Sequence, residues 1–538
     1  MSKKVFFLLA IAGCGGMLYD FGGTIIAPAI PYFEATKLFT ADEIARLTAA
    51  VVLTAAFASL FAGALAEKFG RKPSMLFAAA LAAVACFPIC FCDGNFWLFY
   101  AGRALQGIAA GVLGVIVPMY LAEALPAADR GKGAGVFQFM DVAGILFCSL
   151  VGLAVVKFVG PADSATVSAA AKTVAWKTIF WSSAAPAVLF FVGALGLEES
   201  PVWLAKKNRK IADDSTVQPS TSNLQPKESL FRRKYIYPFV LAVVILACHQ
   251  ATGINSMQYY ALKMFQDAGL SNAAANVGFM IFTGLMLVMT VVACAFVDKK
   301  GRKFLLILGT AGIILSHLGS AGIFWSIERS RSDVTSYVKP LVKDGTSIDV
   351  TVADAVAQAA DKDRFLSEGV VKGDTQIILT YRQGGELAQE IVNQDDEEKK
   401  GALSIKPKEE AKDNSLEVVR AEVGTRPSPT TGWLVVLALL AYISAFSIGP
   451  GVVVWLALSE LMPDRIRANG MAIAMFINMM VAYYIADRLL SLALLYGYSP
   501  VLLGFACSTV VYFLTATFFL PETKGKTLEE IETFFEKR

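Results

Sequence analysis

GALAEKFGRK at residues 63–72 returns later in the chain as CAFVDKKGRK at residues 294–303, and in both copies an acidic residue stands three positions before the Gly-Arg-Lys. A second motif follows each copy, as AEALPAADRG at residues 122–131 and SELMPDRIRA at residues 459–468. The later two motifs stand farther apart, by about the length of one polar stretch from residue 327 to 431. Without that stretch the two halves align, so the sequence predicts an internal duplication with one insertion.

The composition is typical of a membrane protein. Hydrophobic residues make up 55% of the 538 positions and charged residues 17%, and the mean hydropathy is +0.55, which is more apolar than a soluble core requires. A membrane-spanning helix needs about 20 mostly apolar residues. About twelve such segments are present, six on each side of a Ser/Pro/Gln-rich linker near residue 215. Parallel repeats of apolar segments around one site are typical of secondary transporters.

We therefore predict an all-α membrane protein with twelve transmembrane helices and a polar insertion between helices 9 and 10. The predicted parts are an N-terminal six-helix bundle at 1–200, a cytoplasmic linker at 201–234, helices 7–9 of the C-terminal bundle at 235–326, the insertion at 327–430, helices 10–12 at 431–520 and a tail at 521–538. Parts of the insertion alternate like strands (SIDVTV, TQIILTY) and one part has helical spacing, which favours a small folded domain. Its charged runs leave a disordered loop as the alternative.

Lysine and arginine in the short loops indicate the orientation. They gather on one side of the predicted helices, at residues 68–72, 130–132, 206–234, 299–303, 465–467 and after 524, whereas the opposite loops carry few cations. Because cationic short loops face the cytoplasm, we expect both termini there and the insertion outside. The chain contains no Asn-x-Ser/Thr sequon, which favours a bacterial inner membrane.

Cysteine and histidine argue against several other classes of function. The eight Cys are scattered through apolar segments without CxxC spacing, so we expect buried thiols rather than disulfides or a zinc site. The two His stand in no metal-ligand spacing, and no GxxxxGK[ST] phosphate loop is present. The sequence thus predicts no enzyme, no metal, no bound cofactor and no nucleic-acid partner.

Several motifs in order resemble the sugar porter branch of the major facilitator superfamily, and in particular the bacterial xylose/proton symporters. They are the two Gly-Arg-Lys motifs, GRALQGIAAGVLGVIVPMYLAEALPAADRG at 102–131, ESPVWL at 199–204, HQATGINSMQYY at 249–260, GPGVVVW at 449–455 and PETKGKTLEEIE at 521–532. The resemblance implies the major facilitator fold, in which two six-helix bundles expose one central site to each side in turn. It implies a proton-coupled importer of a monosaccharide or polyol, and we expect a monomer. The alternatives are a passive sugar facilitator, and a nutrient sensor or receptor that uses the insertion, whose partner the sequence does not identify.

Asp20 is a carboxylate in the middle of a predicted membrane helix. A charged carboxylate there raises the free energy of the folded protein unless it is paired, protonated or in a water-filled cavity. Such residues are therefore usually functional. We expect its partner to be Arg103, the one arginine inside the predicted fourth helix. By resemblance the two form a proton-coupling pair, with the proton as coupling ion; the alternative is a purely structural ion pair.

Charged residues in the repeated motifs predict a gate on the cytoplasmic side. We expect them to bridge the two bundles when that side is shut and to separate when it opens, since exposed ion pairs are individually weak. The alternative is that they only fix the topology. The set is Glu67, Arg71, Glu123, Arg130, Glu199, Asp298, Arg302, Glu460 and Arg467.

A sugar site needs amide and indole groups beside an aromatic wall. By resemblance these groups are Gln138, Gln250, Asn255, Trp455 and Asn478, with His249 standing where glutamine is usual and with Tyr259 and Tyr260 closing the outer side. For any one of the polar residues the alternative is a bond between helices. Gly449, Pro450 and Gly451 are expected to break the tenth helix and provide a hinge.

Departures from the family pattern limit how far the substrate is identified. Met286, Met479 and Val202 replace residues that are polar or aromatic in the family. Asp141 stands three residues after Gln138, on the same helical face, where the family has an aliphatic residue. Its alternatives are a hydrogen bond to a substrate hydroxyl, a pairing with His249, a second proton site, and a structural hydrogen bond.

Overall fold

The computed structural model describes residues 3–125, 130–215, 232–359, 374–395, 401–407, 415–463, 466–522, 530 and 535. Side chains are described for these residues except at 3–4, 130–134, 209–215, 297–298, 455–460 and 467–469. Within this part of the chain, twelve helical spans are long and apolar enough to cross a membrane. The predicted number of membrane helices and their helical nature are confirmed.

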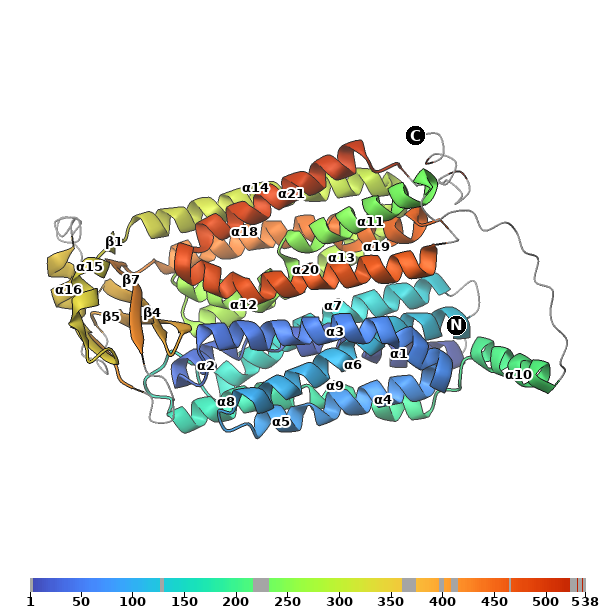
Figure 1. The fold of residues 1–538 in the computed structure, drawn as a ribbon, viewed down its shortest axis with the longest axis horizontal. Coiled ribbons are helices and arrows are strands. Elements are labelled where there is room, and N and C mark those ends of the chain that lie inside the picture. The colour runs from blue at the N-terminus through green and yellow to red at the C-terminus, as the bar shows by residue number, and fades with distance from the viewer. Residues whose placement is uncertain are drawn as a thin grey trace.

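The first six spans form the N-terminal half, which lies in the lower part of Figure 1. Its helices are α1 (Lys3–Thr24), α2 (Ile30–Thr36), α3 (Ala41–Phe69), α4 (Arg71–Val84), α5 (Cys86–Cys90), α6 (Phe96–Ala124), α7 (Arg130–Phe158), α8 (Ala169–Trp181), α9 (Ala184–Leu195) and α10 (Pro201–Ser215). Close backbone approach shapes this half: a Cβ added to Gly111 of α6 would lie 2.4 Å from the Ala55 carbonyl oxygen of α3.

The last six spans form the C-terminal half above it (Figure 1). Its helices are α11 (Arg233–Ala251), α12 (Ile254–Asp267), α13 (Asn272–Lys300), α14 (Arg302–Arg329), α18 (Pro429–Ile448), α19 (Pro450–Leu461), α20 (Arg467–Tyr496) and α21 (Tyr498–Phe518). The seventh and tenth spans are each broken, at Gly253, whose φ is +84°, and at Gly449–Pro450. The halves pack together along α3 with α20 and along α7 with α13.

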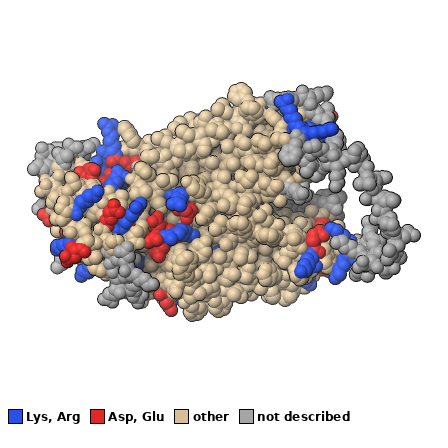
Figure 2. Space-filling model, in the orientation of Figure 1, with Lys and Arg blue, Asp and Glu red and all other residues tan. Residues whose placement is uncertain are grey.

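Charged side chains lie at the two ends of the molecule, and a broad band between them carries almost none on the face seen in Figure 2. Large apolar side chains such as Phe61 and Leu315 are exposed on the helices of this band. An apolar belt of this kind fits the hydrocarbon core of a bilayer, which is about 30 Å thick. Below, the end that carries both termini is called the termini side, and the opposite end the insertion side.

A small β-domain occupies the insertion side (Figure 1). One sheet has the order β1-β7-β4-β5, from β1 (Ser332–Asp333), β7 (Leu416–Thr425), β4 (Thr375–Gln383) and β5 (Glu386–Asn393). The other has the order β2-β3-β6, from β2 (Val342–Lys343), β3 (Ser347–Thr351) and β6 (Ala402–Ile405), and all the pairings are antiparallel. The connecting segments α15 (Thr335–Val338), η2 (Lys339–Leu341) and α16 (Val352–Gln358) complete it.

The β-domain has an apolar core of its own. Ile348, Ile377, Leu379, Val392 and Val423 are fully buried in one cluster contributed by both sheets. The alternation expected for SIDVTV is the alternation of buried and exposed side chains along β3. Burial of this cluster stabilises the insertion as a folded unit.

Candidate transport site and gates

Arg103 of α6 is completely buried in the centre of the N-terminal half. Its Nη1 donates to the Gly22 carbonyl at 2.5 Å and to Gln106 Oε1 at 2.7 Å, its Nη2 donates to the Gly23 carbonyl at 3.2 Å, and its Nε donates to the Leu47 carbonyl at 3.1 Å. The carbonyls of Gly22 and Gly23 are available because α1 ends at Thr24, where the last carbonyls of a helix have no partner within it. The guanidinium therefore ties α1, α3 and α6 together.

The expected ion pair between Asp20 and Arg103 does not form in this conformation. Asp20 is half-buried on α1 and makes no hydrogen bond or ion pair with any residue that the structure describes. The physical reason is that the Arg103 donors are directed at backbone carbonyls beyond Asp20, at the end of the helix. Both side chains still act electrostatically on the Cys148 thiol, so they lie in one region.

Asp141 of α7 is the second carboxylate of this region and is only 7% exposed. Gln138 Nε2 donates to Asp141 Oδ2 at 3.2 Å, while Oδ1 has no partner among the described residues. Asp141 interacts electrostatically with Asp20 across the close contact of α1 and α7, where a Cβ on Gly144 would lie 2.4 Å from the Met17 carbonyl oxygen. Two carboxylates thus share one part of the membrane interior.

The predicted polar residues of the C-terminal half gather around His249 of α11. The His249 ring lies 5.3 Å from the ring of Phe446 and interacts with the side chain of Asn478 from α20. The oxygens Gln250 Oε1 and Asn478 Oδ1 are buried and have no partner among the described residues. The suggested pairing of His249 with Asp141 is not formed within the described part of the chain, because Asp141 Oδ2 accepts from Gln138 and Asp141 Oδ1 has no partner there.

The remaining predicted substrate residue with a described side chain is Asn255, which is half-buried at the start of α12, directly after the break at Gly253. The side chain of Trp455 lies outside the described part of the chain.

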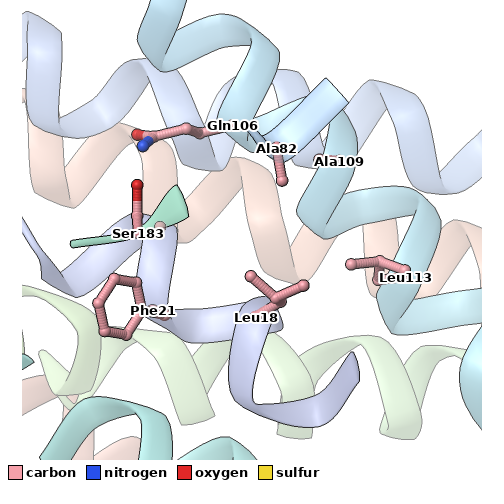
Figure 3. A pocket seen from close by; sticks show the side chains of 8 residues that line it. Leu18, Phe21, Ala82, Gln106, Ala109, Leu113 and Ser183 are labelled. Atoms are coloured by element: carbon pink, nitrogen blue, oxygen red, sulfur yellow. The ribbon is translucent and has the colours of Figure 1, made fainter. Parts of the chain in front are cut away.

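A small pocket lies within the N-terminal half (Figure 3). Its polar lining is the Gln106 amide, which accepts from Arg103, and the Ser183 hydroxyl, and Figure 3 shows these two groups pointing toward one another. Leu18 and Leu113 line its apolar end. The pocket contains none of the predicted substrate residues and does not lie between the halves.

The insertion side is closed by contacts between the halves. Tyr259 and Tyr260 are buried on α12. Tyr259 lies against Gly23 at the end of α1 in the opposite half, while Tyr260 Oη donates to the Ala486 carbonyl of α20, within its own half, at 3.2 Å. Beside them Lys263 Nζ of α12 forms an ion pair with Glu34 of α2 at 3.0 Å. The tyrosines therefore stand at the predicted outer closure, although their role there remains a prediction.

Further contacts beside this closure, two within the C-terminal half and one between the halves, were not predicted from the sequence. Lys263 also pairs with Asp267 at 2.9 Å, and Tyr498 Oη donates to Asp267 Oδ2 at 2.8 Å. Ser149 Oγ and Thr283 Oγ1 lie 2.8 Å apart across α7 and α13. The available signal was the Lys263–Asp267 spacing of four residues at the end of the seventh predicted span, which marks a charged pair on one helical face.

Glu34 lies outside the membrane-spanning helices. Partial burial raises the pKa of the Glu34 carboxyl above its ordinary value, and the nearby Lys263 ammonium opposes this effect. The carboxyl thus has a greater tendency to bind a proton when the insertion side is closed than it has in water.

The repeated motif on the termini side forms a compact network in the N-terminal half. Arg71 is buried and grips Glu123 with two hydrogen bonds of 2.9 and 2.8 Å, and it also contacts Glu67 at 3.3 Å. Lys206 pairs with Glu67 at 2.7 Å, and the Ser200 hydroxyl donates to Glu123. These partners all belong to one half, so among the residues whose side chains the structure describes, Glu67, Arg71 and Glu123 form no bridge between the bundles.

Glu199 and Glu522 occupy equivalent places in the two halves. Glu199 Oε1 accepts from the backbone N–H groups of Arg71 and Lys72 at 3.0 and 3.3 Å, at the start of α4. Glu522 accepts from those of Arg302 and Lys303 at 3.1 and 3.2 Å, at the start of α14. Glu199 therefore anchors a helix start rather than bridging the halves, and Glu522 is a functional candidate that sequence reasoning missed.

The glycine of each Gly-Arg-Lys motif makes this anchor possible. Gly70 and Gly301 have φ values of +105° and +91°, a conformation that favours glycine. A Cβ there would lie 2.2 Å from Glu199 Oε2 and 2.6 Å from Glu522 Oε2 respectively. The other predicted gate residues, Arg130, Asp298, Glu460 and Arg467, have side chains outside the described part of the chain.

Comparison with known proteins places this geometry in a family. A family model described as sugar (and other) transporter matches residues 30–338 and 418–535. The chain belongs to this family. The match leaves out residues 339–417, which lie within the β-domain, and residues 1–29, which include α1, so it covers eleven of the twelve membrane spans of this sugar transporter family member.

Curated relatives of this sugar transporter family member extend along nearly the whole chain. It is 24% identical to a probable metabolite transport protein of Bacillus subtilis, over 97% of this chain and 93% of that protein. It is 25% identical to inositol transporter 4 of Arabidopsis thaliana, over 98% and 91% respectively. These relatives are transporters, as predicted, and not enzymes.

Solved structures show the same fold. The inward-open xylose transporter XylE from E. coli matches with a TM-score of 0.65 at 22% identity, covering 98% of this chain and 99% of that one. A D-xylose–proton symporter matches with a TM-score of 0.63 at 22% identity, covering 98% and 100%. The predicted major facilitator fold is confirmed for this integral membrane protein.

Proposed function

We propose that this sugar transporter family member is a proton-coupled symporter that imports a monosaccharide or polyol by alternating access. The observation that carries the proposal is Asp20, a half-buried carboxylate on a membrane helix with no hydrogen bond or ion pair to the described residues. A carboxylate in such a place is costly when charged, so binding a proton there lowers the free energy of the buried state. The similarity in fold to a D-xylose–proton symporter supports the same chemistry.

The proton carrier and the guanidinium have separate tasks in this proposal. Arg103 stays bonded to the carbonyls at the end of α1, so it holds a positive charge near Asp20 without neutralising it by direct contact. Asp141, which interacts electrostatically with Asp20, is the second candidate proton site. Like charges on neighbouring carboxylates favour one shared proton over two ionised groups.

The substrate would bind between the halves, where buried acceptor oxygens could receive hydrogen bonds from it. Among the residues that the structure describes, Asp141 Oδ1, Gln250 Oε1 and Asn478 Oδ1 are acceptors without a donor, and the hydroxyl groups of a sugar or polyol are such donors. Gln138, His249, Asn255 and Trp455 are the further substrate-binding candidates. The similarity to inositol transporter 4 supports a polyol as one candidate substrate.

The closed insertion side represents one state of the cycle. Cationic loops favour a cytoplasmic termini side, so the β-domain would be periplasmic and the protein would reside in a bacterial inner membrane. Tyr259, Tyr260 and the Glu34–Lys263 pair would then close the outer side. The predicted gate residues around Arg71, together with Glu522, would order the helix starts on the cytoplasmic side.

Uptake into liposomes tests the proposal. With a panel of hexoses, pentoses and inositols and an imposed potential of about 100 mV, the natural protein should accumulate its cargo up to roughly fiftyfold, since one proton then supplies about 2.3 kcal/mol. Asp20→Asn should abolish accumulation and retain counterflow exchange. Asp93→Asn, which removes an exposed carboxylate of a loop, is the matched control and should accumulate normally. Accumulation by Asp20→Asn equal to that of the control contradicts proton coupling through Asp20, and counterflow without any accumulation by the natural protein indicates a passive facilitator.

A further inference from the structure

The β-domain is carried by the C-terminal half. Its first strand follows α14 and its last strand leads into α18, both of which belong to that half. At its base Arg331 pairs with Glu422 at 3.4 Å, and Arg420 donates to the Leu495 carbonyl at the end of α20 at 3.5 Å. Covalent and polar links on the same half make the domain move with it.

The same domain also forms ion pairs and a hydrogen bond with the N-terminal half. Lys37 pairs with Glu390 of β5 at 2.9 Å, and Arg46 of α3 pairs with Glu386, the first residue of β5. The backbone N–H of Leu387 donates to Asp42 Oδ2 at 2.9 Å. Figure 1 shows the β4–β5 hairpin against the ends of α2 and α3. The strand therefore holds the segment 37–46 by contacts that are remote in sequence.

Two of these contacts gain support from their surroundings. The Leu387 side chain is buried and belongs to the apolar cluster of the helical bundle rather than to the core of the β-domain. Asp42 accepts from the Ser491 hydroxyl of α20 through its other oxygen at 2.5 Å. Asp42 is thus fixed from both the domain and the C-terminal half.

We propose that the β-domain is a latch that holds the insertion side closed. The proposal rests on the alternating access proposed above, because opening that side must separate segment 37–46 from the C-terminal half. A domain fixed to the C-terminal half must then release Lys37, Asp42 and Arg46. The latch is distinct from the Glu34–Lys263 pair, which joins helices of the two halves directly.

The expected effect is moderate, which suits a contact that must open in every cycle. Lys37 is 63% exposed and Arg46 43%, and exposed ion pairs are individually weak. Removing both should raise the ratio of open to closed states roughly three- to tenfold. Such a latch sets how often the outer side opens without preventing it.

Distances between spin labels on the two halves test the latch in the full-length protein in lipid nanodiscs. The labels are attached at Ala170→Cys and Ala273→Cys, two exposed alanines that begin α8 and α13 at the insertion side, after Cys14, Cys248, Cys294 and Cys507 are replaced by serine. The double variant Lys37→Ala, Arg46→Ala should increase the long-distance population by the stated factor. Lys343→Ala is the matched control, because its partner Asp349 lies within the domain.

A charge exchange separates the latch from a folding defect. Arg46→Glu alone should open the insertion side, and adding Glu386→Arg should restore the natural distribution. Lys263→Ala, which breaks the direct pair, should also increase the open population. The latch is overturned if the double variant matches Lys343→Ala while Lys263→Ala opens the outer side. If no variant or added sugar changes the distances, alternating access itself fails and the latch fails with it.

Discussion

At the scale of the residue, the sequence identified where charge enters the membrane but not what the charge contacts. Asp20 and Arg103 are visible because each interrupts an apolar run. Their contacts depend on where α1 ends, since the carbonyls of Gly22 and Gly23 take the Arg103 donors. A difference of one helical turn in that end would direct the guanidinium elsewhere, and such ends are poorly determined by sequence pattern alone.

Glu34 provides a prediction about pH. Its pKa is raised when the insertion side is closed and should return toward the ordinary value, about 4.3, when opening exposes it to water. Because the closed state then binds the proton more readily, it gains stability as the pH falls toward that ordinary value and loses this gain as the pH rises through the raised pKa. Glu34→Gln should therefore flatten the pH dependence of closure.

Label distances measured between pH 7 and pH 4.5 across Ala170→Cys and Ala273→Cys provide the readout. Besides Lys263, the charged and titratable groups near Glu34 are Asp267 and Tyr498, which remain in the variant. Glu43→Gln is the control, since that carboxylate caps α3 within its own half. An equal pH dependence of the label distances in Glu34→Gln and the natural protein would contradict the assignment of the pH effect to Glu34.

At the scale of the element, the duplication acquires a physical meaning. In each half a glutamate, Glu199 or Glu522, accepts from the first backbone N–H groups of the helix that follows a Gly-Arg-Lys glycine. A carboxylate at a helix start satisfies unpaired donors and interacts favourably with the helix dipole. The motif repeats because the same helix start is built twice.

Removing the second anchor should destabilise the protein modestly. Glu522→Ala leaves the first N–H groups of α14 without this acceptor, and the loss of a helix cap amounts to about 1 kcal/mol. The midpoint of thermal unfolding in detergent, followed by tryptophan fluorescence, should fall relative to the natural protein. Glu522→Gln keeps one of the two acceptor oxygens and should recover part of the loss, whereas an equal fall in both variants would contradict the capping role.

The two broken spans show which helix breaks can be predicted from the sequence. Gly449-Pro450-Gly451 predicts a break, and α18 ends and α19 begins there. Gly253 was not singled out, although its positive φ separates α11 from α12 in the same manner. Proline predicts a helix break because it lacks the backbone N–H that the helix needs. A glycine in an apolar run can lie inside a helix or at a break, and only its φ distinguishes the two.

At the scale of the whole molecule, helix number and the place of the insertion followed from the sequence because hydropathy and repeats are strong, local signals. The docking of the β-domain on the opposite half did not follow. Lys37 and Glu390 are 353 positions apart and are both ordinary charged residues, so nothing in the sequence pairs them. Such contacts form only because the folded β-domain and the helix ends of the opposite half lie next to each other in three dimensions.

Deleting the β-domain should spare the transport path. Replacement of residues 331–426 by a short Gly/Ser link removes the domain core but leaves the helices intact, since α14 ends at Arg329 and α18 begins at Pro429. We expect the variant to elute as a single species in detergent and to retain uptake in liposomes. A folded variant without uptake would show that the domain is part of the path rather than a regulator, whereas retained uptake is the result that a separate receptor role also requires.

The pairing of β1 with β7, Ser332 opposite Val423, has a consequence for the history of this chain. The two strands bring the first and last residues of the domain side by side. The end of α14 and the start of α18 are therefore connected as closely as by a short loop. A genetic event could splice such a cassette into an ancestral loop, or excise it, without disturbing what lies below.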